Sequence, residues 1–291
     1  MAAGFLSSEF VHNYKRNASA IAGSLILVVF ALIVVAGPLM VWQNPYDIAQ
    51  LDLMDAFKPP MWLEGGEARF PFGTDGQGRD VLAGVLYGTR VSVLIGLSAM
   101  AMSCVIGTTL GLLAGFYGGR LDAVIMRIAD IQLSFPSMLI ALFLMSAFGT
   151  GIDKVLISLT AVGWVVYART VRGSTLSEVQ KEYIQAARVA GLRDGKIIRR
   201  HILPNVMTPL IVVATVQVGT FILIEASLSF LGVGVPITEP SLGLLIKNGF
   251  DVLFSGLWWT SVFPGIVIMA LVFGINLFGD FLRDELNPRL K

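Results

Sequence analysis

Charged residues are scarce in this chain of 291 residues, at 14% of the total, whereas a typical soluble protein carries about a quarter. This scarcity argues against a soluble domain, and a net charge of +1 gives no indication of nucleic-acid binding. Cys104 is the only cysteine, which excludes a disulfide or a thiolate metal cluster within the chain. The histidines, His12 and His201, are too few and too scattered for a metal site. No residues arrange a nucleophile with a base, so no catalytic residue is predicted.

Long apolar blocks take the place of the missing charges: 55% of the residues are hydrophobic and the mean hydropathy is +0.75. A helix needs about 20 mainly apolar residues to cross the hydrocarbon core, and isolated strands cannot satisfy their backbone groups there. The sequence therefore predicts an all-α polytopic transmembrane bundle with six spans, the fourth of them short unless it extends. The expected spans cover residues 18–42, 91–116, 124–148, 155–168, 206–231 and 257–282.

Lysine and arginine are distributed unevenly among the segments between these blocks. The largest basic group lies between Arg169 and Arg200, and further basic residues precede the first block and follow the last. Basic residues accumulate on the cytoplasmic side of a membrane protein. This predicts cytoplasmic N- and C-termini, outer loops over residues 43–90 and 232–256, and a basic inner loop over residues 171–205.

The inner loop has the signals of two short helices. Ser177 and Gln180 fit a capping box, which would open a helix directly after Ser177. Gly191 can end that helix in the left-handed conformation, and Asp194 can cap a second short helix. Pro204 suits the first turn of the next span. We therefore expect a short helical pair at the membrane boundary, suited to docking in a cleft.

The order of residues in this loop resembles a known motif. Gln185-Ala186-Ala187, then Gly191, then Leu203-Pro204 resembles the cytoplasmic loop of binding-protein-dependent ABC importer permeases. Gln185 stands where that family usually has glutamate, which leaves only a neutral hydrogen bond, and His201 replaces an isoleucine. Three more stretches look like the C-type permease of the dipeptide/oligopeptide subfamily: FGTDGQGRDVLAGVLYGTRVSVLIG from Phe72, GFYGGRLDAVIMRIADIQLSFP from Gly115 and EASLSFLGVGVPITEPSLG from Glu225.

The resemblance implies a type I ABC importer permease fold in the cell (inner) membrane and a transport subunit rather than an enzyme. It implies partners: a second homologous permease, two ATP-binding subunits, an extracytoplasmic solute-binding protein and membrane lipid. ATP and Mg would be bound by the ATPase subunits, with no cofactor in this chain, and the cargo would be peptides. It also implies that ATPase coupling rests on Glu182, Tyr183, Gln185, Ala186, Ala187, Gly191, Arg200, Leu203 and Pro204.

On this interpretation the chain divides into four parts. They are a cytoplasmic tail (1–19), a first span with a long outer loop (20–88), a core permease domain (89–283) with its coupling loop at about 172–204, and a cytoplasmic C-terminal tail (284–291).

Three further patterns bear on alternative functions. Glu225 is the only acid well inside a span; we expect a neutral or hydrogen-bonded side chain near an outer gate, while an ion-coupled secondary transporter or channel using Glu225 is the alternative. Arg79 and Asp80 are expected in local pairs within a tight outer loop, because a calcium loop would need a different spacing. The stretch from Gly191 to Lys196 is one residue too short for a phosphate-binding loop. A membrane scaffold without transport activity would leave the ordered inner loop unexplained.

Overall fold

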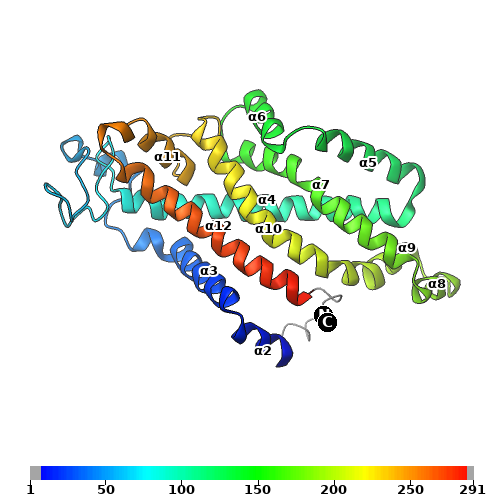
Figure 1. The fold of residues 1–291 in the computed structure, drawn as a ribbon. Helices are drawn as coiled ribbons and strands as arrows, with labels where there is room; N and C mark the ends of the chain where they lie inside the picture. The colour runs from blue at the N-terminus through cyan, green and yellow to red at the C-terminus, as the bar shows by residue number, and fades with distance from the viewer. Residues whose placement is uncertain (1–7, 287–291) are drawn as a thin grey trace.

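The structure, a computed structural model, describes residues 8–286 and is helical almost throughout (Figure 1). Within these residues no β-strand forms, and the only β-contact is an isolated bridge between Thr74 and Asp80. The outermost parts of the two expected tails, 1–7 and 287–291, lie outside the described residues. The α-helices are α2 (Ser8–Arg16), α3 (Ala18–Ala36), α4 (Val81–Tyr117), α5 (Gly119–Leu133), α6 (Ser137–Phe148), α7 (Ile152–Val179), α8 (Glu182–Val189), α9 (Asp194–Ile197), α10 (Leu203–Phe230), α11 (Leu242–Phe250) and α12 (Trp259–Leu286).

Short turns complete the helical elements. Three-residue 3₁₀ turns follow α3, interrupt the long loop before α4 and follow α11, and a π-helical turn joins α9 to α10. Their bounds are Gly37–Leu39 (η1), Ile48–Gln50 (η2), Leu53–Asp55 (η3), Leu253–Ser255 (η5) and, for the π turn, Ile198–Ile202 (η4).

Five helical segments of the described chain are long and apolar enough to cross a membrane, which agrees with the predicted bundle. They are α3 with η1, α4, α7, α9 continued through η4 into α10, and α12. A sixth crossing exists only if α5 and α6 count as one span, and these two helices meet at 91°. The helical span expected over residues 124–148 is therefore divided into two helices by a bend. Pro136 has no N–H and disfavours helix at Phe135, so the chain turns there.

Two other spans are longer than predicted. α4 begins at Val81, ten residues before the expected start, and α7 covers Ile152–Val179 instead of the short apolar core alone. Hydropathy marks only the part of a helix that lies in hydrocarbon. These helices continue past it, because Asp80 caps α4 and polar residues extend α7 beyond its apolar part.

Glycines let α4 and α7 pack at close range. A Cβ on Gly107 would lie 2.4 Å from the Trp164 carbonyl oxygen, and one on Gly111 would lie 2.5 Å from that of Ala168. Gly115 continues the same stripe one turn later. Helices in lipid gain no hydrophobic effect from pairing, so close backbone contact through small residues is their main source of attraction.

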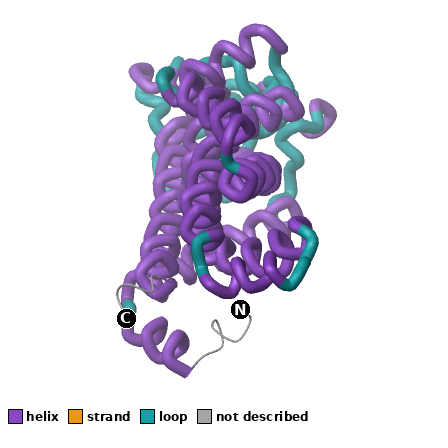
Figure 2. Tube along the Cα trace, turned by 90° about the vertical axis from the view of Figure 1, so that its right-hand side faces the viewer, coloured by secondary structure: helices purple, strands orange, loops and turns teal. Residues whose placement is uncertain are grey.

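The bundle has two distinct ends. α8 lies at one end, together with α2 and the C-terminal end of α12, while α11 and the loop before α4 lie at the other (Figure 1). Figure 2 views the molecule from the α8 end and shows α2 set off from the long helices. Phe10 and Tyr14 of α2 pack edge-on against Phe281 of α12. We call these the α8 end and the α11 end.

Candidate functional site

The α8 helix begins four residues later than the capping-box pattern predicts. Ser177 lies inside α7, and α8 starts at Glu182 after a turn at Gln180. The capping-box prediction is wrong, because α7 continues through Ser177 and uses that residue in its own last turns. The predicted end of the helix is confirmed: Gly191 has φ +75°, and the Leu192 N–H donates to the Ala187 carbonyl at 3.1 Å, as in a Schellman motif.

Tyr183 connects three helices. Its hydroxyl donates to the carboxylate of Glu178 in the last turn of α7, and it accepts from Asn205 Nδ2, at 3.1 Å, in the first turn of α10. Lys181 Nζ lies 2.7 Å from the same carboxylate. Burial and the hydrogen bond to Glu178 raise the pKa of Tyr183 to about 12, so the phenol keeps its proton at neutral pH. Any movement of α8 therefore acts directly on α7 and α10.

Sequence reasoning missed two of these residues, Glu178 and Asn205. Neither contact follows from helical spacing, because the three segments meet only when α7 extends to Val179 and the chain turns back at Gln180. No sequence signal marked Glu178, because most of its neighbours in the sequence are polar, yet the structure gives that residue an exposed fraction of only 6%.

The two faces of α8 differ in character. Ile184 is fully buried with Ile197 and Ile202, which fixes α8 and the following turn onto the bundle. The opposite face exposes Ala186 and Val189, the latter at 90%. Of the other predicted coupling residues, Glu182, Gln185, Gly191 and Arg200 are also exposed, while Ala187, Leu203 and Pro204 are half-buried. The exposed side of α8 is thus a small apolar surface with polar edges.

After a turn at residues 190–193, α9, the π turn and α10 form one continuous helix with a widened turn. Asp194 is the first residue of α9 and makes no side-chain cap, so the predicted cap is wrong. Pro204 lies in the first turn of α10, as predicted, directly after the π turn. A proline clashes with the carbonyl four residues earlier, and the wider π turn relieves that clash.

A polar cavity of about 770 Å³ opens beside this junction. α7, α10 and α12 line it, and its polar side chains are those of Thr170, Ser174, Ser177, Glu178, Asn205, Thr208 and Arg283. The hydroxyls of Thr170 and Ser174 donate to carbonyls of their own helix, which leaves their oxygen lone pairs directed outward. The cavity can therefore hydrogen-bond a polar molecule, and Glu178 and Arg283 add one charged side chain of each sign to its lining.

Glu225 lies in a second polar cluster toward the α11 end. Its carboxylate accepts from Ser92 Oγ of α4 at 2.7 Å and from Ser229 Oγ of α10 at 2.8 Å. Ser92 Oγ in turn accepts from the backbone N–H of Leu242, the first residue of α11, at 3.3 Å. Glu225, Ser92 and Ser229, here called the Glu225 cluster, are fully buried. This cluster joins α4, α10 and α11.

Asp80 and Arg79 lie in the loop before α4. The carboxylate of Asp80 accepts from the Leu82 N–H at 2.9 Å and caps α4. The partner of Asp80 is therefore the start of that helix. Burial raises the pKa of Asp80 to about 6. The guanidinium of Arg79 lies 5.1 Å from the centre of the Tyr46 ring. The backbone N–H of Arg79 donates to the carboxylate of Asp75.

In the described part of the chain, no group of three or more His, Cys, Asp or Glu side chains is placed so that it could hold a metal ion.

Two known families match separate parts of the chain and leave residues 61–106 between them. Residues 107–291 match the family described as binding-protein-dependent transport system inner membrane component. Residues 6–60 match the N-terminal transmembrane domain of oligopeptide transport permease C. The second match includes α2, α3 and the beginning of the loop before α4.

Curated relatives and a solved structure agree with these matches. The chain is 38% identical to the di/tripeptide transport system permease protein DppC of Pseudomonas aeruginosa, over 97% of this chain and 92% of that protein. It is 36% identical to the oligopeptide transport system permease protein OppC of Bacillus subtilis, over 96% and 88%. An inward-facing structure of the MetNI methionine ABC transporter superposes with a TM-score of 0.56 at 20% identity, over 69% of this chain and 96% of that one, which shows a shared fold. The chain therefore belongs to the binding-protein-dependent transport system inner membrane components, the multi-pass permease subunits of ABC importers, which are transport proteins rather than enzymes.

Proposed function

We propose that this chain is the C-type permease subunit of a peptide importer and that partner ATPases drive it through α8. The observation that carries the proposal is the architecture of α8: an exposed apolar face around Val189, backed by a Tyr183 hydroxyl that contacts both α7 and α10. An exposed apolar helix face in a polar environment marks a surface for a partner. ATP and Mg would be bound by the ATPase subunits alone.

Motion would pass from α8 to the far end of the bundle through α10. Asn205 contacts Tyr183 at one end of this helix, and Glu225 joins α4 and α11 near the other. The 20 residues between them span about 30 Å at 1.5 Å per residue, close to the thickness of the hydrocarbon core. A helix of that length can carry displacement of α8 to α11, and Pro209, which lies inside it, is where it can bend most easily. Partner subunits that favour one arrangement would then shift the access of the pathway.

The peptide cargo follows from the relatives and fits the cavity. Both relatives are named as permeases for di/tripeptides or oligopeptides. Hydroxyl and amide groups such as Ser174, Thr208 and Asn205 can bond the backbone that all peptides share. We propose that this cavity is half of the translocation pathway and that a second homologous permease supplies the other half.

Glu225 would act at the outer gate by holding α11 in place. We interpret the hydrogen bonds that its carboxylate accepts from Ser92 and Ser229 as the contacts that do this. In an ion-coupled carrier, by contrast, this carboxylate would have to be reached by the ion. Its complete burial and direct bonds to Ser92 and Ser229 favour the structural role.

The proposed orientation sets the α8 end in the cytoplasm. Both α2 and the end of α12 lie at that end, so the two termini would also be cytoplasmic (Figure 1). Most lysine and arginine residues of the chain belong to segments that this orientation puts on the same side, as expected for a cytoplasmic face. A solute-binding protein would deliver peptides at the α11 end.

A pair of substitutions tests the coupling surface. Val189→Asp places a charge on the proposed ATPase contact, and Ile237→Asp makes the same kind of change at another exposed position, in the segment before α11, where the exposed fraction is 75% against 90% at Val189. We expect Val189→Asp to lower both ATPase co-purification and peptide uptake at least tenfold, since a charge buried without a partner is costly. Ile237→Asp is expected to keep the ATPase bound. Equal retention of ATPase by both variants would rule out docking on α8.

A further inference from the structure

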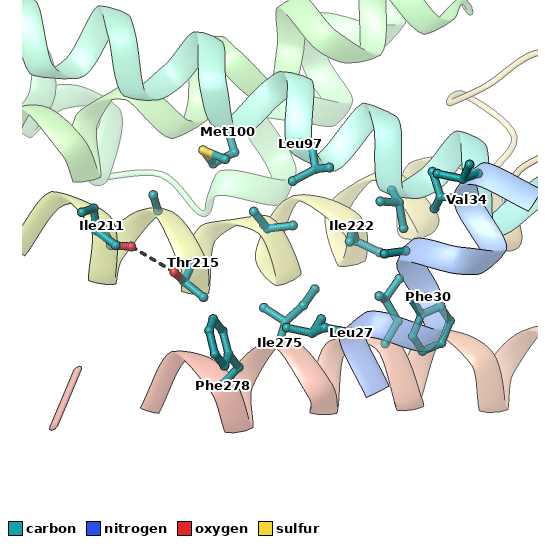
Figure 3. Close-up of a pocket in the computed structure, with 16 residues that line it drawn as sticks. Leu27, Phe30, Val34, Leu97, Met100, Ile211, Thr215, Ile222, Ile275 and Phe278 are labelled. Atoms are coloured by element: carbon teal, nitrogen blue, oxygen red, sulfur yellow. Dashed lines mark hydrogen bonds between the residues drawn. The ribbon is translucent and has the colours of Figure 1, made fainter. Parts of the chain in front are cut away.

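An apolar groove lies within the membrane-spanning part of the bundle, away from the polar cavity (Figure 3). α10 forms its floor, α4 and α12 form its walls, and α3 crosses over one end. Phe30, Met100, Ile222 and Ile275 are among the side chains that line it. Its volume is about 520 Å³.

The apolar side chains that line the groove make water an unfavourable occupant. Thr215 is the only lining residue with a polar side chain, and its hydroxyl donates to the Ile211 carbonyl at 3.0 Å (Figure 3). A buried water needs two to four polar partners, which this groove does not offer. An empty groove would forfeit the dispersion contacts of all its lining side chains. An apolar occupant is therefore favoured.

The size of the groove separates a helix from a lipid chain. Its floor runs from Ile211 to Ile222, about 16 Å at 1.5 Å per residue. A helix that crosses the membrane is about 30 Å long, nearly twice the length of this floor. A methylene chain about 4 Å across, the contact distance of carbon atoms, needs roughly 200 Å³. The groove thus has room for one or two hydrocarbon chains.

The position of the groove fits the same occupant. A length of about 16 Å is roughly half of the 30 Å hydrocarbon core, the depth that the chains of one leaflet occupy. The groove is also continuous with the exposed apolar surface of α3, because Val35, which lines it, is 76% exposed and Leu32 beside it is 61% exposed. Lipid chains can enter from that side without crossing any polar group.

We propose that this groove is a binding site for the acyl chains of a phospholipid. The occupant sits against α10 and beneath α3, and it fills space that would otherwise separate these helices. The site needs only that the chain spans a membrane, so it does not depend on the peptide cargo or on the ATPase contact.

Photolabelling of the assembled importer tests the site. The importer is reconstituted in vesicles of phosphatidylethanolamine and phosphatidylglycerol that contain a trace of phosphatidylglycerol with a diazirine in mid-chain. After irradiation, mass spectrometry maps the label. We expect labelling of residues 211–222 to exceed that of the exposed Val105 surface several-fold, because a bound chain stays in place while a passing lipid does not.

Two alanines of α3 provide a matched pair. Ala31 lines the groove and Ala22 does not, and both are exposed. Ala31→Phe should reduce the labelling of residues 211–222 several-fold, and Ala22→Phe should leave it unchanged. The proposal fails if Ala31→Phe has no effect or if the groove is labelled no more than Val105. It also fails if the groove stays unlabelled and Ala214→Cys forms crosslinks to another subunit, since a protein helix would then be the occupant.

Discussion

Individual polar residues hold the two ends of this bundle together. Tyr183 joins α8 to α7 and α10, and Glu225 joins α10 to α4 and through Ser92 to α11. A polar group buried in hydrocarbon is costly unless its hydrogen bonds are made. Each contact therefore favours one relative position of its helices, and losing it releases them.

Substitution of Glu225 separates a structural role from ion coupling. Glu225→Gln keeps an oxygen acceptor, so we expect peptide uptake within about threefold of wild type. Glu225→Ala leaves two buried serine hydroxyls without their acceptor, at a cost of about 1–3 kcal/mol. Thermal unfolding of the purified chain, followed by the reaction of a thiol dye with Cys104, its only cysteine, measures this loss. Abolished uptake in a well-folded Glu225→Gln protein would contradict the structural role.

Residue patterns predicted local features better than contacts between segments. Gly191 was predicted to end a helix because only glycine enters the left-handed region cheaply, and it has φ +75°. The hydrogen-bonded state of Glu225 was also expected, but its partner Ser92 lies 133 residues away in the sequence. Nothing in one sequence encodes such a pairing directly. The same limit hid Asn205, whose partner Tyr183 becomes its neighbour only after the chain turns twice.

At the scale of elements, α4 and α7 form the most intimate pair in the bundle. Gly107, Gly111 and Gly115 repeat every four residues and present a smooth face of α4 to α7. The backbone of α7 passes within van der Waals contact of this face, so any added side-chain atom must push the two helices apart.

Two glycine substitutions test this packing. A Cβ at Gly111 would lie 2.5 Å from the Ala168 carbonyl oxygen, whereas one at Gly173 of α7 meets nothing within 4 Å. Gly111→Ala should destabilise the chain by about 1–3 kcal/mol through overpacking. Gly173→Ala should be neutral or stabilise it by up to about 1 kcal/mol, because alanine is the better helix former. Thermal unfolding compares them, and equal stability of the two variants would refute close packing at Gly111.

Hydropathy located the membrane helices but could not set their ends or their bends. It found the apolar cores of α3, α10 and α12 within a few residues, because lipid imposes a minimum apolar length. It joined α5 to α6 into one span, because the bend at Pro136 depends on backbone sterics rather than on polarity. It also missed α11, which is too short to cross a membrane and packs onto α10 and α4.

At the scale of the whole molecule, α10 connects the two regions that transport would have to coordinate. It contacts Tyr183 at the α8 end and carries Glu225 toward the α11 end, and it lines both the polar cavity and the apolar groove. A helix continuous from Asp194 to Phe230 has few ways to absorb displacement internally. Its irregularities are the π turn before Pro204 and Pro209 inside α10, and both lie near the end where α8 would deliver force.

Uptake of labelled dipeptide into proteoliposomes tests the central claim most directly. The vesicles hold either this chain alone or the full importer with its second permease, ATPase subunits and binding protein, with ATP or an ion gradient as the energy source. We predict uptake only by the full importer with ATP and binding protein, and its loss in Val189→Asp. Uptake by this chain alone, driven by an ion gradient and abolished by Glu225→Gln, would contradict the account.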